Sequence, residues 1–181
     1  LTLITAGAVF MMVVSTHYSF NRTIETIFKG FGFDVAVGFA QPQRIDEVVP
    51  LIESRPNVDR AEMWVFAGPK GRKPGDTSPG AEHQVFLRGI PADTELFTPE
   101  LTAGRLLDPA DGHALLLNQK LAGEMGLAVG DQIELDFGPA GESTWTIVGL
   151  LFDLGGNQES AFVNRETLSA DLGDVGRATV A

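Results

Sequence analysis

The first 20 residues contain no Lys, Arg, Asp or Glu. A helix of this length rises about 1.5 Å per residue and is about 30 Å long, which matches the hydrocarbon core of a bilayer. The segment predicts the outer part of a transmembrane helix that holds the rest of the chain on one side of a membrane. Two other interpretations stay open: a truncated signal peptide, and a core helix of a water-soluble protein, because small and polar residues dilute its apolar character.

The remainder of the chain is acidic. The 181 residues carry 24 Asp and Glu against 13 Lys and Arg, which gives a formal charge of −11. This balance excludes nucleic acid as an expected partner, because phosphate binding requires Lys and Arg to neutralise the backbone. It also disfavours binding along an anionic lipid surface. The chain has no cysteine, which excludes disulfides, thiolate nucleophiles and cysteine-bound zinc.

The next part of the chain predicts a strand, a helix and a second strand. Apolar residues at helical spacing between residues 21 and 31 extend the first helix out of the membrane, and Gly30 and Gly32 end it. Alternation over residues 33–40 then predicts a strand, and residues 43–54 predict an amphipathic helix with Pro50 inside it. Residues 58–67 predict the second strand, which completes a βαβ unit.

Residues 68–80, GPKGRKPGDTSPG, are rich in Gly and Pro and predict an exposed loop. Lys70, Arg72 and Lys73 in this loop form a basic cluster within the acidic body of the chain. They are candidates for a contact with a partner, and the alternative is that water simply solvates them.

The second half of the chain predicts an inserted hairpin and a second βαβ unit. Residues 84–89 and 114–117 predict strands, and Asn118 and Gly126 mark the two ends of a short helix. Residues 132–137 and 143–152 alternate and predict a hairpin, with Trp145 on its apolar face and therefore in the core. Residues 160–163, a helix capped by Asn164, and residues 177–181 predict the second βαβ unit.

Sequence motifs of catalysis and of metal binding are absent. The three histidines lack ligand spacing, and the chain has neither a P-loop nor a nucleophile elbow. Residues 108–112, DPADG, fail as a calcium loop, because proline takes the second position and Gln119 stands where a bidentate glutamate is required. We expect no catalytic, cofactor-binding or metal-binding residue.

Several short motifs follow one another in a characteristic order. They are RPNV at residues 55–58, LTAGRLL at 101–107, LA at 121–122, VGDQI at 129–133 and WTIVG at 145–149. With this order and spacing, the chain resembles the extracytoplasmic domain of MacB/FtsX/LolC-type ABC transporter permeases. The resemblance extends from the first helix to Ala181.

The resemblance implies an α+β fold. A transmembrane helix and its extension would occupy residues 1–32. Residues 33–90 and 153–181 would form a porter-like lobe of two βαβ units, with an inserted β-rich lobe at residues 91–152. Gly104 and Arg105 are the strongest motif positions. Arg105 is either a contact between the lobes that pairs with a carboxylate, or a surface arginine after a turn.

The resemblance also implies a function. The chain would belong to a permease subunit of the cell membrane, with this domain outside the cytoplasm and no cofactor of its own. Its partners would be a cytoplasmic ATPase subunit, a second permease subunit, the lipid bilayer, and an adaptor or lipoprotein. ATP-driven motion would pass to the domain and export or release a hydrophobic or peptide-like substrate. Rival hypotheses are a membrane-tethered sensing domain, for example for antimicrobial peptides, and a soluble enzyme.

Overall fold

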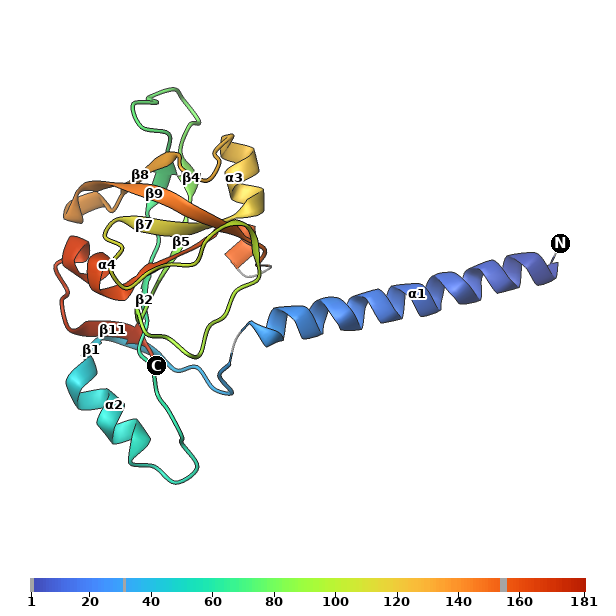
Figure 1. Ribbon diagram of the computed structural model, residues 1–181, viewed down its shortest axis with the longest axis horizontal. Helices are drawn as coiled ribbons and strands as arrows, with labels where there is room; N and C mark the ends of the chain where they lie inside the picture. The colour runs from blue at the N-terminus through green and yellow to red at the C-terminus, as the bar shows by residue number, and fades with distance from the viewer. Residues whose placement is uncertain (1, 31, 154–155) are drawn as a thin grey trace.

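Helix α1 (Thr2–Lys29) projects away from a body that contains all the other elements (Figure 1). The computed structural model describes residues 2–30, 32–153 and 156–181. Between Val9 and Phe20, α1 exposes large apolar side chains to 47–70% of their surface. The predicted first helix is therefore confirmed as a helix. Among the described residues we find no helix with the length and apolarity needed to cross a bilayer, so the predicted membrane crossing is not confirmed.

The body is built on a mixed sheet that, in the described residues, has nine strands. Strands β5 and β10 run parallel, as do β7 and β9, and the other neighbours are antiparallel. The α+β class is confirmed. In spatial order the strands are β2 (Val65–Ala67), β5 (Phe86–Ile90), β10 (Ser160–Asn164), β7 (Ala114–Asn118), β9 (Glu142–Leu151), β8 (Gln132–Asp136), β3 (Lys70–Arg72) and β4 (His83–Gln84), and β6 (Leu101–Gly104) pairs with β9.

The sheet curls until its two ends meet in one bent hairpin. Only Gly68 and Pro69 separate β2 from β3, and only Val85 separates β4 from β5. Strand β2 pairs with β5 and β3 pairs with β4. Because β2 continues into β3 and β4 continues into β5, one bent hairpin forms both ends of the sheet. Gly71 permits the close approach inside the curl, because a Cβ there would lie 2.7 Å from Cγ2 of Val85. Closure of this kind leaves few unpaired strand edges.

The two faces of the sheet carry two apolar clusters. In β7, Leu115 and Leu117 point into the larger cluster and Leu116 into the smaller, as the period of two in a strand requires. Trp145 lies in the larger cluster with no exposed surface, which confirms its predicted place in the core. The smaller cluster contains Trp64, Ile90, Phe97, Leu116, Leu151 and Phe162.

A two-stranded sheet of β1 (Gly38–Arg44) and β11 (Arg177–Val180) lies beside the large sheet. On its other side, β11 forms a β-bridge between Val180 and Trp64, the residue before β2, so the small sheet is connected to the large one there. The remaining elements are α2 (Ile45–Glu53), α3 (Gln119–Met125), α4 (Arg165–Leu172) and the short 3₁₀ turns η1 (Gly138–Ala140) and η2 (Gly156–Gln158).

Three predictions of secondary structure need correction. The strand expected at residues 33–40 begins only at Gly38 and continues through Pro42. Proline is tolerated there because the β1–β11 ladder is irregular between Gly38 and Gln43. The strand expected at 58–67 is confined to its last three residues, and the loop expected at 68–80 contains β3, because pairing with β8 overrides its Gly- and Pro-rich composition.

The helical ends are predicted well, with one exception. Asn118 accepts a hydrogen bond from the amide of Lys120 at 2.9 Å, and Gly126 ends α3 in the left-handed conformation. Asn164 precedes α4 as expected, but its side chain does not cap the helix. It donates instead to the carbonyls of Asp108 and Asp111, at 2.9 and 3.0 Å.

The two expected lobes share one sheet. Strand β10 belongs to the expected porter-like lobe and pairs with β7 of the expected insertion. The sheet therefore crosses the expected boundaries at residues 91 and 152, and the division of the chain into lobes stays a prediction.

Candidate interaction site

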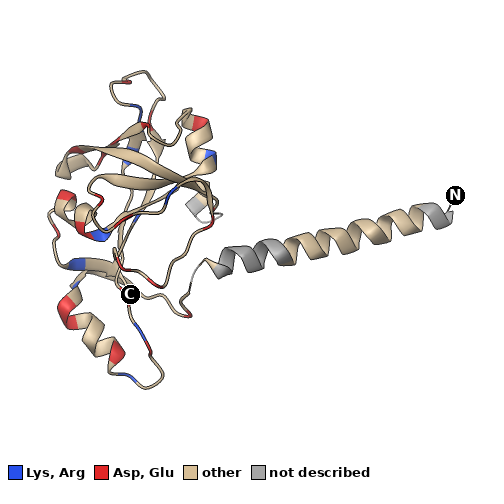
Figure 2. Ribbon diagram, viewed as in Figure 1, with Lys and Arg blue, Asp and Glu red and all other residues tan. Residues whose placement is uncertain are grey.

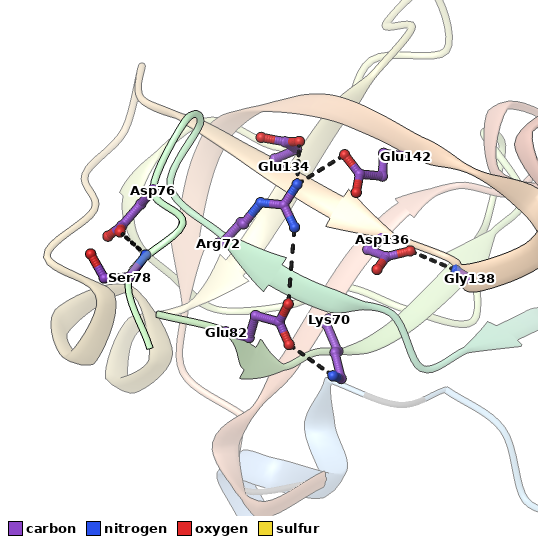
Figure 3. A network of polar contacts seen from close by, with 9 residues as sticks. All are labelled: Lys70, Arg72, Asp76, Ser78, Glu82, Glu134, Asp136, Gly138 and Glu142. Carbon is purple, nitrogen blue, oxygen red and sulfur yellow. Dashed lines mark hydrogen bonds and ion pairs between the residues drawn. The ribbon is translucent and has the colours of Figure 1, made fainter. Parts of the chain in front are cut away.

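Two residues of the predicted basic cluster, Lys70 and Arg72, lie on β3, between β8 and β4. Arg72 Nη2 donates to Glu134 Oε1 at 2.7 Å and to Glu142 Oε2 at 2.9 Å, as Figure 3 shows. Lys70 Nζ lies 2.8 Å from Glu82 Oε2, and Glu82 also faces Arg72. Strand pairing produces this network, since β3 aligns Arg72 with Glu134 of β8.

The network is acidic overall. Lys70 and Arg72 face four carboxylates, those of Glu82, Glu134, Asp136 and Glu142. Hydrogen bonds to Glu142 and Glu134 raise the pKa of Arg72, and a hydrogen bond to Glu82 raises the pKa of Lys70. Hydrogen bonds with Glu142 and from Arg72 lower the pKa of Glu134. The two cations are therefore engaged within the domain, and their contact with a partner stays a prediction.

Lys73 lies apart from this network. Its Nζ approaches the carboxyl end of α3, since a Cβ on Gly126 would lie 3.3 Å from it. A cation is favourable there because the last carbonyls of a helix carry partial negative charge. In the turn that follows, hydrogen bonds from Ser78 lower the pKa of Asp76.

Gly104 and Arg105 end β6 and begin the next loop. Gly104 has φ +78°, and a Cβ there would lie 2.7 Å from Cα of Gly149. Arg105 holds Asp111 with two hydrogen bonds of 2.7 and 2.8 Å. The hydrogen bond from Arg105 is the main reason that the pKa of Asp111 is lowered. Arg105 thus pairs with a carboxylate of its own loop, and its role as a contact between the lobes stays a prediction.

The structure does not bring all the predicted site residues together. Glu142, which binds Arg72, lies at the start of β9. Gly149, which pairs with Gly104, lies near the end of β9. At about 3.3 Å per residue, these two positions are about 23 Å apart along the strand. The cluster on β3 and the Gly104–Arg105 turn are therefore separate features, joined by β9.

The Arg105–Asp111 pair gives a testable pH dependence. Because the pKa of Asp111 is lowered in the folded state, the pair stabilises the fold above the unfolded pKa near 3.8 and loses this effect as pH falls through the folded value. We expect a double-mutant cycle of Arg105→Met and Asp111→Asn to give a small favourable coupling at pH 7, since the pair is partly exposed. Urea unfolding should show a smaller coupling at pH 2 than at pH 7. Equal coupling at both pH values would contradict the assignment.

A comparison with protein families decides what kind of domain this is. The model of the MacB-like periplasmic core domain matches residues 1–181. The chain belongs to the MacB-like periplasmic core domain family. No curated protein matches it significantly.

Solved structures share the fold of this periplasmic core domain. The periplasmic region of MacB from Actinobacillus actinomycetemcomitans is 10% identical, with a TM-score of 0.60 over 84% of this chain and 74% of that one. The extracellular domain of the noncanonic ABC-type transporter YknZ from Gram-positive bacteria is 12% identical, with a TM-score of 0.59 over 80% and 79%. A domain of a protein described as a permease, from Porphyromonas gingivalis, is 22% identical, with a TM-score of 0.52 over 76% and 60%.

One buried carboxylate of this periplasmic core domain is not predicted from the sequence. Glu62 precedes β2 and is 8% exposed. Its Oε1 accepts from the amide of Glu95 at 3.0 Å, and its Oε2 accepts from Oγ1 of Thr94 at 2.6 Å. The signal in the sequence is a single acidic residue inside an otherwise apolar run, since a charge in such a run is buried only with partners.

A polar cluster on the outside of the larger core is likewise not predicted from the sequence. Asp171 of α4 accepts from Oγ of Ser143 at 2.7 Å and lies 3.0 Å from Nε2 of His113. Ser143 in turn accepts from Nε1 of Trp145 at 2.7 Å. The cluster ties α4 to β9 by satisfying the polar edge of a buried indole. Within residues 2–30, 32–153 and 156–181, no three His, Asp or Glu side chains are placed to hold a metal ion.

Proposed function

We propose that the chain is the extracytoplasmic domain of an ABC transporter permease. In this role it couples ATP-driven movement of transmembrane helices to export or release of a hydrophobic or peptide-like substrate, or to an adaptor protein. The family match over the whole chain supports this proposal. The structural observation that carries it is the apolar helix that leaves an acidic body.

The distribution of charge supports a membrane location for α1. Figure 2 shows acidic and basic residues spread over the body, whereas residues 5–21 of α1 include no Asp, Glu, Lys or Arg. Phe10, Met12 and Tyr18 are each 66–70% exposed on this helix. Apolar surface of this extent on a projecting helix is costly in water, because each large side chain gains roughly 1.5–3 kcal/mol when it is buried. We propose that lipid covers it.

Other subunits would supply the remaining parts of the machine. The chain has no P-loop, so ATP hydrolysis would take place on a cytoplasmic ATPase subunit. A second permease subunit would complete the membrane part, and a periplasmic adaptor or lipoprotein would contact the body. The Gly104–Arg105 turn and Lys73 are candidate contacts for such partners, because Arg105 and Lys73 lie on the surface.

The proposal is tested first on the helix. Val13 is 61% exposed on α1, and Val175 is 76% exposed in the turn after α4. We expect Val13→Asp to weaken binding of the chain to neutral phosphatidylcholine vesicles about 100-fold, since an Asp at the centre of a membrane helix costs roughly 2.5–3.5 kcal/mol. Val175→Asp adds the same charge to the body and should leave vesicle flotation unchanged. Equal binding of both variants would contradict a membrane role for α1.

The second arm of the test concerns partners. The native gene product, tagged and extracted from membranes, should copurify with a subunit that hydrolyses ATP, whereas a tethered sensor would be recovered without one. Val175→Asp should retain this subunit. Recovery of the native product free of any ATPase, under conditions that preserve membrane complexes, would refute the permease assignment.

A further inference from the structure

The chain leaving α1 is bound to one loop of the body. The amide of Gly32 donates to the carbonyl of Leu96 at 2.8 Å, and the amide of Thr98 donates to the carbonyl of Gly30 at 2.9 Å. These two backbone bonds lie on either side of residue 31. Gly32 allows the close approach, since a Cβ there would lie 3.5 Å from Cα of Leu96. The exit of α1 is thus hydrogen-bonded to residues 96–98.

Aromatic rings continue this contact into the sheet. The ring of Phe33 meets that of Trp64 edge-on at 5.9 Å, and Trp64 meets Phe97 in the same way at 5.9 Å. Phe97 stacks on Phe162 at 4.2 Å, and Phe162 lies in β10 with no exposed surface. Pairs at these distances contribute roughly 0.5–1.5 kcal/mol each beyond the burial of their area. Phe33, four residues after the end of α1, is therefore connected by packed rings to the centre of the sheet.

Glu62 holds the loop that receives the exit of α1. Glu62 accepts hydrogen bonds from Thr94 and from the amide of Glu95, and its Oε1 also lies 3.2 Å from Nε of Arg60. Nη1 of Arg60 in turn lies 2.6 Å from the carboxylate of Glu95. Nε1 of Trp64 donates to Glu62 at 3.4 Å. Residues 91–100 contain no helix and only a single β-bridge, at Phe97, so these bonds take the place of the regular pairing that would otherwise order the loop.

We propose that Gly30, Gly32 and Phe33, together with residues 94–98 and Glu62, form a rigid exit joint that fixes the direction of α1 relative to the sheet. Glu62 is its positioning residue. Figure 1 shows α1 projecting away from the body, so its direction is determined where it meets the body. Replacing the Glu62 carboxylate by an amide removes the ion pair with Arg60 and leaves one acceptor oxygen in place of two for Thr94 and the amide of Glu95, which loosens the loop and lets α1 swing. The inference concerns this chain alone and does not depend on the proposed transport function.

Spin labels measure the direction of α1 directly. The chain has no cysteine, so Ser15→Cys on α1 and Ala170→Cys on α4 place two labels and no others. A second pair, Gln119→Cys on α3 and Ala170→Cys, serves as a reference within the body. All four distances, in wild type and Glu62→Gln, are recorded by pulsed electron resonance on the detergent-solubilised chain.

We expect a narrow distribution for both label pairs in the otherwise wild-type chain. Glu62→Gln should broaden the α1–α4 distribution about twofold or more while the α3–α4 distribution stays narrow, as for a loosened hinge. Glu82→Gln is the matched control, because Glu82 also binds a cation but lies on the distant β3–β4 hairpin, and it should change neither distribution. A broad α1–α4 distribution before substitution, or an unchanged one in Glu62→Gln, would overturn the proposal.

If Glu62→Gln also broadens the α3–α4 distribution, a second variant tests the joint without loosening the body. Phe33→Ala removes the first ring of the joint, and Phe33 is 38% exposed, so the core stays filled. It should broaden only the α1–α4 distribution, whereas Val35→Ala, at a position 73% exposed, should leave it narrow. Identical distributions in Phe33→Ala and Val35→Ala would refute the joint.

Discussion

Gly104→Ala is expected to lower the free energy of unfolding by more than about 3 kcal/mol, because two costs combine at this position. The backbone has φ +78°, which L side chains rarely adopt. The added Cβ would also collide with the carbonyl oxygen of Val148 and with Cα of Gly149. Backbone atoms of a central strand cannot yield as a flexible side chain does, so β6 must move away from β9.

Gly130→Ala separates the two costs. Gly130 has φ +95°, but a Cβ there would have no neighbour within 4 Å. Gly130→Ala should therefore lower the free energy of unfolding by about 1–2 kcal/mol, the cost of the dihedral angle alone. Urea unfolding of both variants measures the difference. If Gly104→Ala costs no more than Gly130→Ala, β6 does not lie against β9 as described.

Trp145→Ala is expected to cost about 3–5 kcal/mol, the range for large aromatic side chains removed from a core. Trp145 has no exposed surface, and its Nε1 donates to Oγ of Ser143, so the substitution leaves both a cavity and a polar group without its donor. The thermal midpoint and the urea midpoint should both fall.

Leu106→Ala is the control for this second substitution. Leu106 is 47% exposed, so its truncation should change stability by less than about 0.5 kcal/mol. If Trp145→Ala left stability unchanged and abolished transport in the complete permease, the core assignment would be wrong and the indole would be a contact for substrate.

Local patterns account for the elements that the sequence predicts well. The caps of α3 depend on Asn118 and Gly126, which lie at its own ends, and the β8–β9 hairpin depends on alternation within two adjacent strands. Such signals are complete within a few residues, so a single sequence contains them. The α+β class and the buried Trp145 follow from the same patterns.

Contacts between distant residues account for the failures. Arg72 meets Glu134 and Glu142, which lie 62 and 70 residues further along the chain, and no pattern around Arg72 announces them. The strand β3 exists because β8 pairs with it, although its own composition is typical of a loop. Glu62 is the clearest case, since its partners Thr94 and Glu95 lie in a segment without periodicity.

The antiparallel pairing of β1 with β11 determines how this small sheet responds to mechanical load. Strand β1 begins beside the end of β11, and Val37 and Ala181 exchange two backbone hydrogen bonds of 2.6 and 2.9 Å just beyond the ladder. A force that pulls these two points apart stretches the bonds one after another, as in a zipper, and never shears them all at once. The small sheet should therefore yield at low tension and protect the curled nine-stranded sheet behind it.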